Sequence, residues 1–189
     1  CLGQIFFCLL ATLAYLTSPS AQGDHSLLHR SGGRPVLDRQ TKLASMTVLV
    51  IFVQLMLGAI IRHTGTAGGS KGATLVTSAL LAHVFGALFV GGFVVATVFA
   101  VLNRRRAGSS NRLGYLMVCL FVLQLLLGLG AYWARVVGLQ QVQPLLSDVV
   151  ITTCHVAVGA LLLAGSLILS LSLAQQTESG DSLLDLKES

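Results

Sequence analysis

Four long apolar runs without a charged residue dominate this sequence. They cover residues 43–61, 72–103, 113–134 and 149–177. About 20 apolar residues are enough for a helix to cross the hydrocarbon core of a bilayer, and there a helix satisfies its own backbone hydrogen bonds. The runs therefore predict an all-α membrane protein built on a bundle of four transmembrane helices.

The composition agrees with burial in a membrane. Hydrophobic residues make up 54% of the chain and charged residues only 10%, whereas soluble domains have about 25% charged residues. The net charge of +5 comes from basic residues that cluster between the apolar runs. Basic loop residues are orientation signals in membrane proteins, so we expect a lipid bilayer as the partner and no nucleic acid.

The loops differ in positive charge, and this difference predicts an orientation. Segments 18–42 and 103–112 carry four basic residues each, whereas segments 62–72 and 135–148 carry two and one. Loops rich in Lys and Arg stay in the cytoplasm. We therefore expect the first two segments inside the cell and the other two outside.

Residues 1–17 are apolar from the first position and contain none of the basic residues that begin a signal peptide. We interpret them as the rest of a transmembrane helix that begins upstream of Cys1, and the chain as a fragment of a longer protein. The predicted order is then a partial transmembrane helix, a cytoplasmic loop, a four-helix bundle and a polar cytoplasmic tail, over residues 1–17, 18–42, 43–174 and 175–189.

Two histidines, His83 and His155, lie inside the second and fourth apolar runs. A copy of the pattern Gln-Leu-x-Leu-Gly precedes each of them in the preceding run, at residues 54–58 and 124–128, so the bundle consists of two repeated helical hairpins. Both histidines fall on helices of the same direction, roughly 9–15 Å from the outer end at 1.5 Å per residue. Because hydrocarbon does not hydrate an imidazole, both are candidate functional residues.

Two interpretations of this histidine pair are open. Imidazole is a good ligand for iron, and a haem held by two histidines needs them on facing helices at similar heights. Alternatively, each imidazole is a polar side chain that hydrogen-bonds to a neighbouring carbonyl. The repeated position favours a shared metal cofactor. Gly86 and Gly159 lie on the same helical faces as the histidines, where they make room for a flat ring or allow close helix packing.

Arg62 and His63 end the first apolar run at the predicted outer interface. In one interpretation they are an ordinary helix end, with the Arg62 side chain snorkelling to water and Gly65 terminating the helix. In the other, Arg62 pairs with a haem propionate and His63 borders the edge of the ring. The residue types alone do not decide between the two.

Other reactive groups give weaker signals. No acidic residue lies inside the four runs, so the spans contain no candidate catalytic acid. We expect Gln54 and Gln124 to hydrogen-bond between helices or to the backbone. The cysteines form no CxxC pair, and we expect them to pack as small apolar side chains; they are Cys1, Cys8, Cys119 and Cys154.

Residues 54–65 read Gln-Leu-Met-Leu-Gly-Ala-Ile-Ile-Arg-His-Thr-Gly. This segment resembles the QxxLGAxxRHTG signature of the haem A synthases, membrane proteins of cytochrome c oxidase assembly. As in that family, a span with a histidine near its outer end follows, then a second Gln-x-x-Leu-Gly helix and a final span with a histidine. The resemblance covers roughly residues 43–172.

This resemblance implies an oxidoreductase with eight spans in two similar four-helix bundles, of which this chain is the carboxy-terminal half. In that half, His83 and His155 hold the iron of haem b. The other half oxidises the methyl group of haem O to the formyl group of haem A and supplies the catalytic residues, so we expect this fragment to be inactive alone. The expected cofactor-binding residues are His83, His155, Arg62, His63, Gly86 and Gly159.

The resemblance also implies a setting: the cell (inner) membrane, with haem O as the substrate and with haem O synthase or cytochrome oxidase assembly factors as partners. Two features depart from the family's pattern. Residues 66–70 lack its cysteine- and tryptophan-containing stretch, and Val84 follows His83 where an arginine is common. We therefore expect no electron-transfer disulfide in this half.

Two other functions remain open. One is a membrane b-type cytochrome that transfers electrons without synthase activity. The other is a structural assembly factor whose histidines bind only each other.

Overall fold

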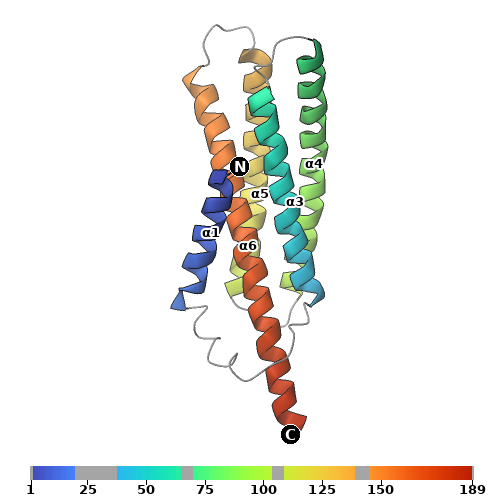
Figure 1. Ribbon diagram of the computed structural model, residues 1–189, viewed down its shortest axis with the longest axis vertical. Coiled ribbons are helices and arrows are strands. Elements are labelled where there is room, and N and C mark those ends of the chain that lie inside the picture. Colours follow the sequence, from blue (N-terminus) through green and yellow to red (C-terminus); the bar gives the residue numbers. More distant parts are fainter. Residues whose placement is uncertain (1, 20–37, 65–69, 104–108, 139–144, 189) are drawn as a thin grey trace.

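The computed structural model describes residues 2–19, 38–64, 70–103, 109–138 and 145–188, which form five α-helices and no strand (Figure 1). In chain order the helices are α1 (Leu2–Leu16), α3 (Arg39–Thr64), α4 (Ser70–Leu102), α5 (Ser109–Gly138) and α6 (Leu146–Glu188).

Four of these helices are long and apolar enough to cross a membrane, over Arg39–Arg62, Val76–Leu102, Ser110–Ala134 and Leu146–Gln175. The predicted all-α, four-span architecture is therefore confirmed, together with a short apolar helix, α1, that precedes it. By the length and composition of its helices, the chain is a multi-pass membrane protein.

The last helix extends further than the sequence predicts. Helix α6 continues to Glu188, through most of the segment expected as a polar tail, and in Figure 1 it projects beyond the other helices. Residues 176–188 contain no proline and include several leucines. Polarity ends the membrane span but does not end a helix, because leucine, glutamate and lysine all favour helical backbone.

The four spans form an antiparallel bundle. Helix α3 packs against α4 and α6, and α5 packs against the same two helices. Helices α4 and α6 therefore lie diagonally across the bundle, and both run in the same direction (Figure 1). The α3–α4 and α5–α6 hairpins each make one half of the ring, as the sequence repeat predicts. Helix α1 packs against α6, where the Tyr15 hydroxyl donates to Gln175 Oε1 at 2.9 Å.

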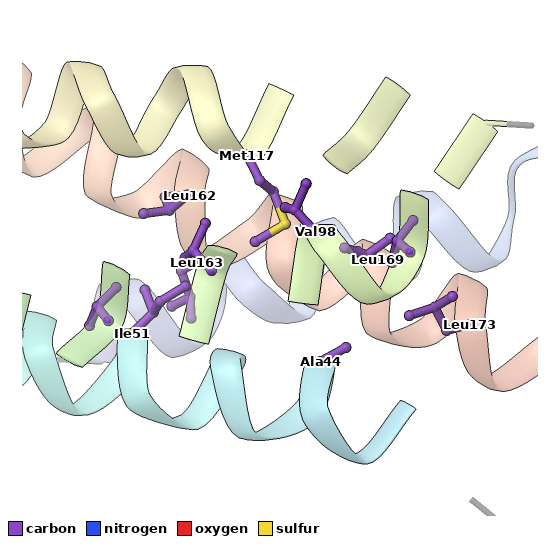
Figure 2. Packing of buried hydrophobic residues seen from close by; sticks show 11 residues of the cluster. Ala44, Ile51, Val98, Met117, Leu162, Leu163, Leu169 and Leu173 are labelled. Atoms are coloured by element: carbon purple, nitrogen blue, oxygen red, sulfur yellow. The ribbon is translucent and has the colours of Figure 1, made fainter. Parts of the chain in front are cut away.

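The apolar core lies toward one end of the bundle, which we call the inner half: the half that contains the beginnings of α3 and α5. Figure 2 shows the buried residues of this cluster as sticks, with Met117 and Val98 close together and with leucines of α6 in the same cluster. On each helix, the members of the cluster lie nearer the inner end than one reference residue: Gln54 on α3, His83 on α4, Gln124 on α5 and His155 on α6. The cluster consists of Ala44, Ile51, Val90, Val94, Val98, Val101, Met117, Leu162, Leu163, Leu169 and Leu173.

Hydroxyl groups link the helices within the inner half. Thr47 Oγ1 and Thr97 Oγ1 are 2.7 Å apart between α3 and α4, and both side chains are buried. Ser45 Oγ and Ser170 Oγ are 2.9 Å apart between α3 and α6. Small polar residues of this kind allow transmembrane helices to approach closely and bond to each other.

Large apolar side chains cover the outside of the bundle. Leu88, Trp133 and Phe99 have exposed fractions of 69%, 68% and 67%. Exposed apolar surface of this extent marks contact with a partner or a membrane. On helices long enough to span a bilayer, lipid is the natural neighbour of these side chains.

Candidate functional site

The two intramembrane histidines lie at similar depths on diagonal helices. His83 is on α4 and His155 on α6, and both are half-buried. Measured from the span starts at Val76 and Leu146, they lie about 10 Å and about 14 Å along their helices at 1.5 Å per residue. The structure thus places both at the depth that the sequence predicts.

Their rings meet across the bundle, although the backbones of α4 and α6 are not neighbours. The ring centres are 6.4 Å apart and the ring planes make an angle of 77°. Bonds between a metal and imidazole nitrogen are about 2 Å long, so two imidazoles on opposite sides of one metal have centres about 6 Å apart. The spacing is that of an ordinary edge-to-face contact between two rings, and it also fits two imidazoles that bind one metal.

Each histidine ring lies on a glycine of the preceding helix. A Cβ atom at Gly58 would lie 3.2 Å from Cε1 of His83, and one at Gly128 would lie 3.0 Å from Cε1 of His155. Real Cβ atoms rarely make contacts this short. Glycine at these two positions therefore lets the imidazole rings approach the backbones of α3 and α5.

The glutamines make the reciprocal contact with glycines of the following helix. A Cβ at Gly86 would collide with Oε1 of Gln54, and a Cβ at Gly159 would lie 3.0 Å from Nε2 of Gln124. Gly86 and Gly159 thus accommodate glutamine side chains directly. In each hairpin, a histidine and a glutamine pack on each other's helices through two glycines.

Hydrogen bonds accompany this packing. The Gln54 amide donates from Nε2 to the main-chain oxygen of His83 at 2.6 Å, which confirms the interhelical role expected for this residue. Nε2 of Gln124 lies 3.4 Å from Nε2 of His155.

Three polar atoms of this cluster are buried without a hydrogen-bond partner: Nδ1 of His83, Nδ1 of His155 and Oε1 of Gln124. Buried polar atoms in proteins nearly always have a partner, and each exception calls for an explanation such as a bound ligand. Donor type, ring spacing and unpartnered atoms together fit a metal-centred group between the histidines.

The kind of group is limited by the number of donors. Within the described residues, no group of three or more His, Cys, Asp or Glu side chains could hold a metal ion. Structural metal sites such as those of zinc take four protein ligands. A metal bound by His83 and His155 would therefore have only these two protein ligands within the described residues. Cys8, Cys119 and Cys154 are free thiols; Cys8 is half-buried, and the other two are exposed.

Arg62 and His63 lie in the last turn of α3, near the end of the bundle opposite the inner half. The Arg62 side chain is exposed. The side chain of His63 lies outside the described part of the structure, as do residues 65–69 of the following segment. Contact between either residue and a bound group stays a prediction.

Sequence reasoning located the histidines but missed the partners of their rings. In the sequence, Gly58 and Gly128 stand out only as the last residue of each Gln-Leu-x-Leu-Gly copy, whereas in the structure they support the two imidazoles directly. The signal was present in the repeat, because each glycine follows its glutamine by four residues and therefore shares its helical face. The missing information was the register between neighbouring helices.

Comparison with protein-family models, with curated proteins and with solved structures finds no match to this chain.

Proposed function

We propose that this chain binds one b-type haem between His83 and His155, and that it is the electron-carrying half of a haem A synthase. The observation that carries the haem proposal is the pair of imidazole rings with centres 6.4 Å apart on diagonal helices. The unpartnered nitrogens of both rings support it further.

The residues around the histidines have distinct roles in this proposal. His83 and His155 would hold the iron of the haem, and Gly58 and Gly128 allow their rings to lie against α3 and α5. Gly86 and Gly159 seat the glutamines, while Arg62 and His63 are candidates for contacts with the propionate edge. When bound, a haem supplies a site for one transferable electron, at a potential set by its axial ligands.

The synthase part of the proposal rests on the signature at residues 54–65, which resembles that of haem A synthases. In such an enzyme, the methyl group of haem O is oxidised to the formyl group of haem A. The spans of α3, α4 and α5 contain no acidic residue, and Asp148 lies in the first turn of α6. We therefore assign the catalytic residues to another bundle and give this one electron transfer.

The same proposal places the chain in the cell (inner) membrane. Its partners there are haem O, and haem O synthase or cytochrome oxidase assembly factors. A membrane b-type cytochrome without synthase activity is the second candidate. It is favoured by one observation: both histidines lie within the bundle of α3–α6, which needs no further helix to bring them together.

Haem binding is tested by purifying the full chain in detergent from haem-replete membranes. We expect a low-spin haem spectrum and one haem per chain, both lost in His83→Ala and in His155→Ala. Gly92→Ala is a suitable control because a Cβ at this position meets no atom within 4 Å. A wild-type chain that purifies without haem would contradict the proposal.

The synthase role is tested separately, by co-expressing the chain with the amino-terminal bundle of a haem A synthase and extracting the haems. Formation of haem A that requires His83 and His155 supports the role. A chain that binds haem normally but never supports haem A formation favours the cytochrome instead.

A further inference from the structure

The two repeated hairpins use their glutamines differently. Gln54 and Gln124 occupy equivalent positions, four residues before a glycine that supports a histidine ring. The amide of Gln54 bonds to the main-chain oxygen of His83 and not to its ring. The amide of Gln124 instead faces the ring of His155, with 3.4 Å between the two Nε2 atoms. The two histidines therefore have different polar surroundings.

This difference matters for a metal-bound imidazole. A histidine that ligates a metal through one ring nitrogen almost always donates the N–H of the other to an acceptor. That second hydrogen bond fixes the tautomer, orients the ring and raises its basicity. In a membrane interior, where water is scarce, a side-chain or main-chain oxygen must provide the acceptor.

We propose that Gln124 is a positioning residue for His155, and that its amide oxygen accepts the remaining ring N–H when His155 ligates iron. This inference rests on the haem site proposed above. Oε1 of Gln124 is buried and has no partner, and the same is true of Nδ1 of His155. The two side chains touch at Nε2 of His155, so this nitrogen would carry the N–H that Oε1 of Gln124 accepts, and the unpartnered Nδ1 is the nitrogen left for iron.

The side-chain amide of Gln124 also has a defined position in the site. Nε2 of Gln124 would lie 3.0 Å from a Cβ at Gly159, so the glycine allows the amide its place beside the ring. Rotation about the last side-chain bond exchanges the amide nitrogen and oxygen without moving the rest of the residue. Gln54 lacks this freedom, because its Nε2 is bonded to the main chain of His83. The two histidines are therefore inequivalent, and His155 is the one whose bond to iron a side chain would tune.

The experiment compares Gln124→Leu with the matched variant Gln54→Leu in the purified, haem-loaded full chain. Two quantities are measured: the haem midpoint potential, and the rate of haem transfer to excess apomyoglobin. Loss of an outer-shell partner typically weakens metal binding 10–100-fold. We expect transfer from Gln124→Leu to be about 10-fold faster or more, with a raised midpoint potential because the imidazole becomes less basic.

Gln54→Leu should lower the thermal stability of the chain and shift the midpoint potential by less than Gln124→Leu does, whereas Gly92→Ala, at an open position, should leave the potential unchanged. Gln124→Glu, which keeps the length and an acceptor oxygen, should hold the potential at or below the wild-type value. If Gln124→Leu does not assemble, Gln124→Ala is measured in the same way. A wild-type potential and transfer rate in a Gln124 variant that lacks the acceptor overturn this inference alone, whereas a haem-free wild type overturns the proposed haem site.

Discussion

The inner half of the bundle and the half that holds the histidines are built on different principles. The inner half contains every member of the buried apolar cluster, and hydroxyl pairs such as Thr47 and Thr97 bond within it. Around His83 and His155 the helices instead present imidazoles, amides and glycines, which pack on one another.

This contrast indicates a division of labour along the bundle axis. Close packing of apolar side chains in the inner half holds α3–α6 together at that end. Each buried contact adds dispersion energy, because side chains of neighbouring helices fit one another more closely than lipid chains do. The other half can then hold polar groups that would be costly alone. Stability and ligand binding should respond to different substitutions, and each prediction below tests that separation.

The largest effect is expected from the histidines. His83→Ala or His155→Ala should abolish haem binding, because one axial ligand of the proposed pair is lost. The helical content measured by circular dichroism and the unfolding midpoint of the haem-free chain should remain at the wild-type level, since the apolar cluster lies elsewhere. Retention of bound haem in a chain that carries both His83→Ala and His155→Ala would show that the histidines are not its ligands.

In the inner half, the corresponding test removes a buried leucine. Leu169 is fully buried with an exposed fraction of 0%, and Leu→Ala changes in protein cores cost about 2–5 kcal/mol. Leu169→Ala should lower the free energy of unfolding in detergent by about this amount, while the haem spectrum keeps its shape. Leu88→Ala, at a lipid-facing position, is the control and should change stability little. Equal losses in the two variants would refute the assignment of the core to the inner half.

A smaller effect is expected at the glycine beneath His155. Gly128→Ala introduces a Cβ 3.0 Å from the ring, so either the imidazole or α5 must shift by a few tenths of an ångström. Haem affinity, measured by titration of the haem-free chain, should fall roughly 10-fold, in the range of other changes that misorient a metal ligand. Gly165→Ala, which meets no atom within 4 Å, is the matched control. An unchanged affinity in Gly128→Ala would show that close ring approach is not required.

The smallest effect is expected from a single interhelical hydroxyl pair. Thr47→Val removes the bond to Thr97 while conserving volume. Such bonds in membrane proteins average about 0.6 kcal/mol. The free energy of unfolding should fall by about this amount, with no change in haem potential or affinity. A change in the potential would show that the two halves are coupled.

The sequence predicts the spans and the depth of the histidines well, because both follow from hydropathy and helical rise. Charge-free runs locate the membrane spans of α3–α6 to within a few residues, and the 54–58 and 124–128 repeats identify the hairpins. The seating of His83 on Gly58 depends on how neighbouring helices slide and rotate against each other. The residue pattern of a single helix does not determine this relative position of two helices.

Other features are beyond single-sequence patterns for different reasons. Gln54 and Gln124 have equivalent sequence surroundings, yet one bonds to a backbone oxygen and the other faces a ring. Such a difference arises from small displacements between helices. The continuation of α6 to Glu188 was missed because polarity indicates the end of a membrane span and gives no information on the end of a helix.

The central claim is that His83 and His155 form one axial ligand pair, and its most direct test is the haem content and ligation of the purified full chain. Haem per chain is measured together with near-infrared magnetic circular dichroism, which distinguishes bis-histidine ligation from other axial pairs. The account predicts one low-spin, bis-histidine haem per chain. A haem-free chain, or a haem with any other ligand pair, would contradict it.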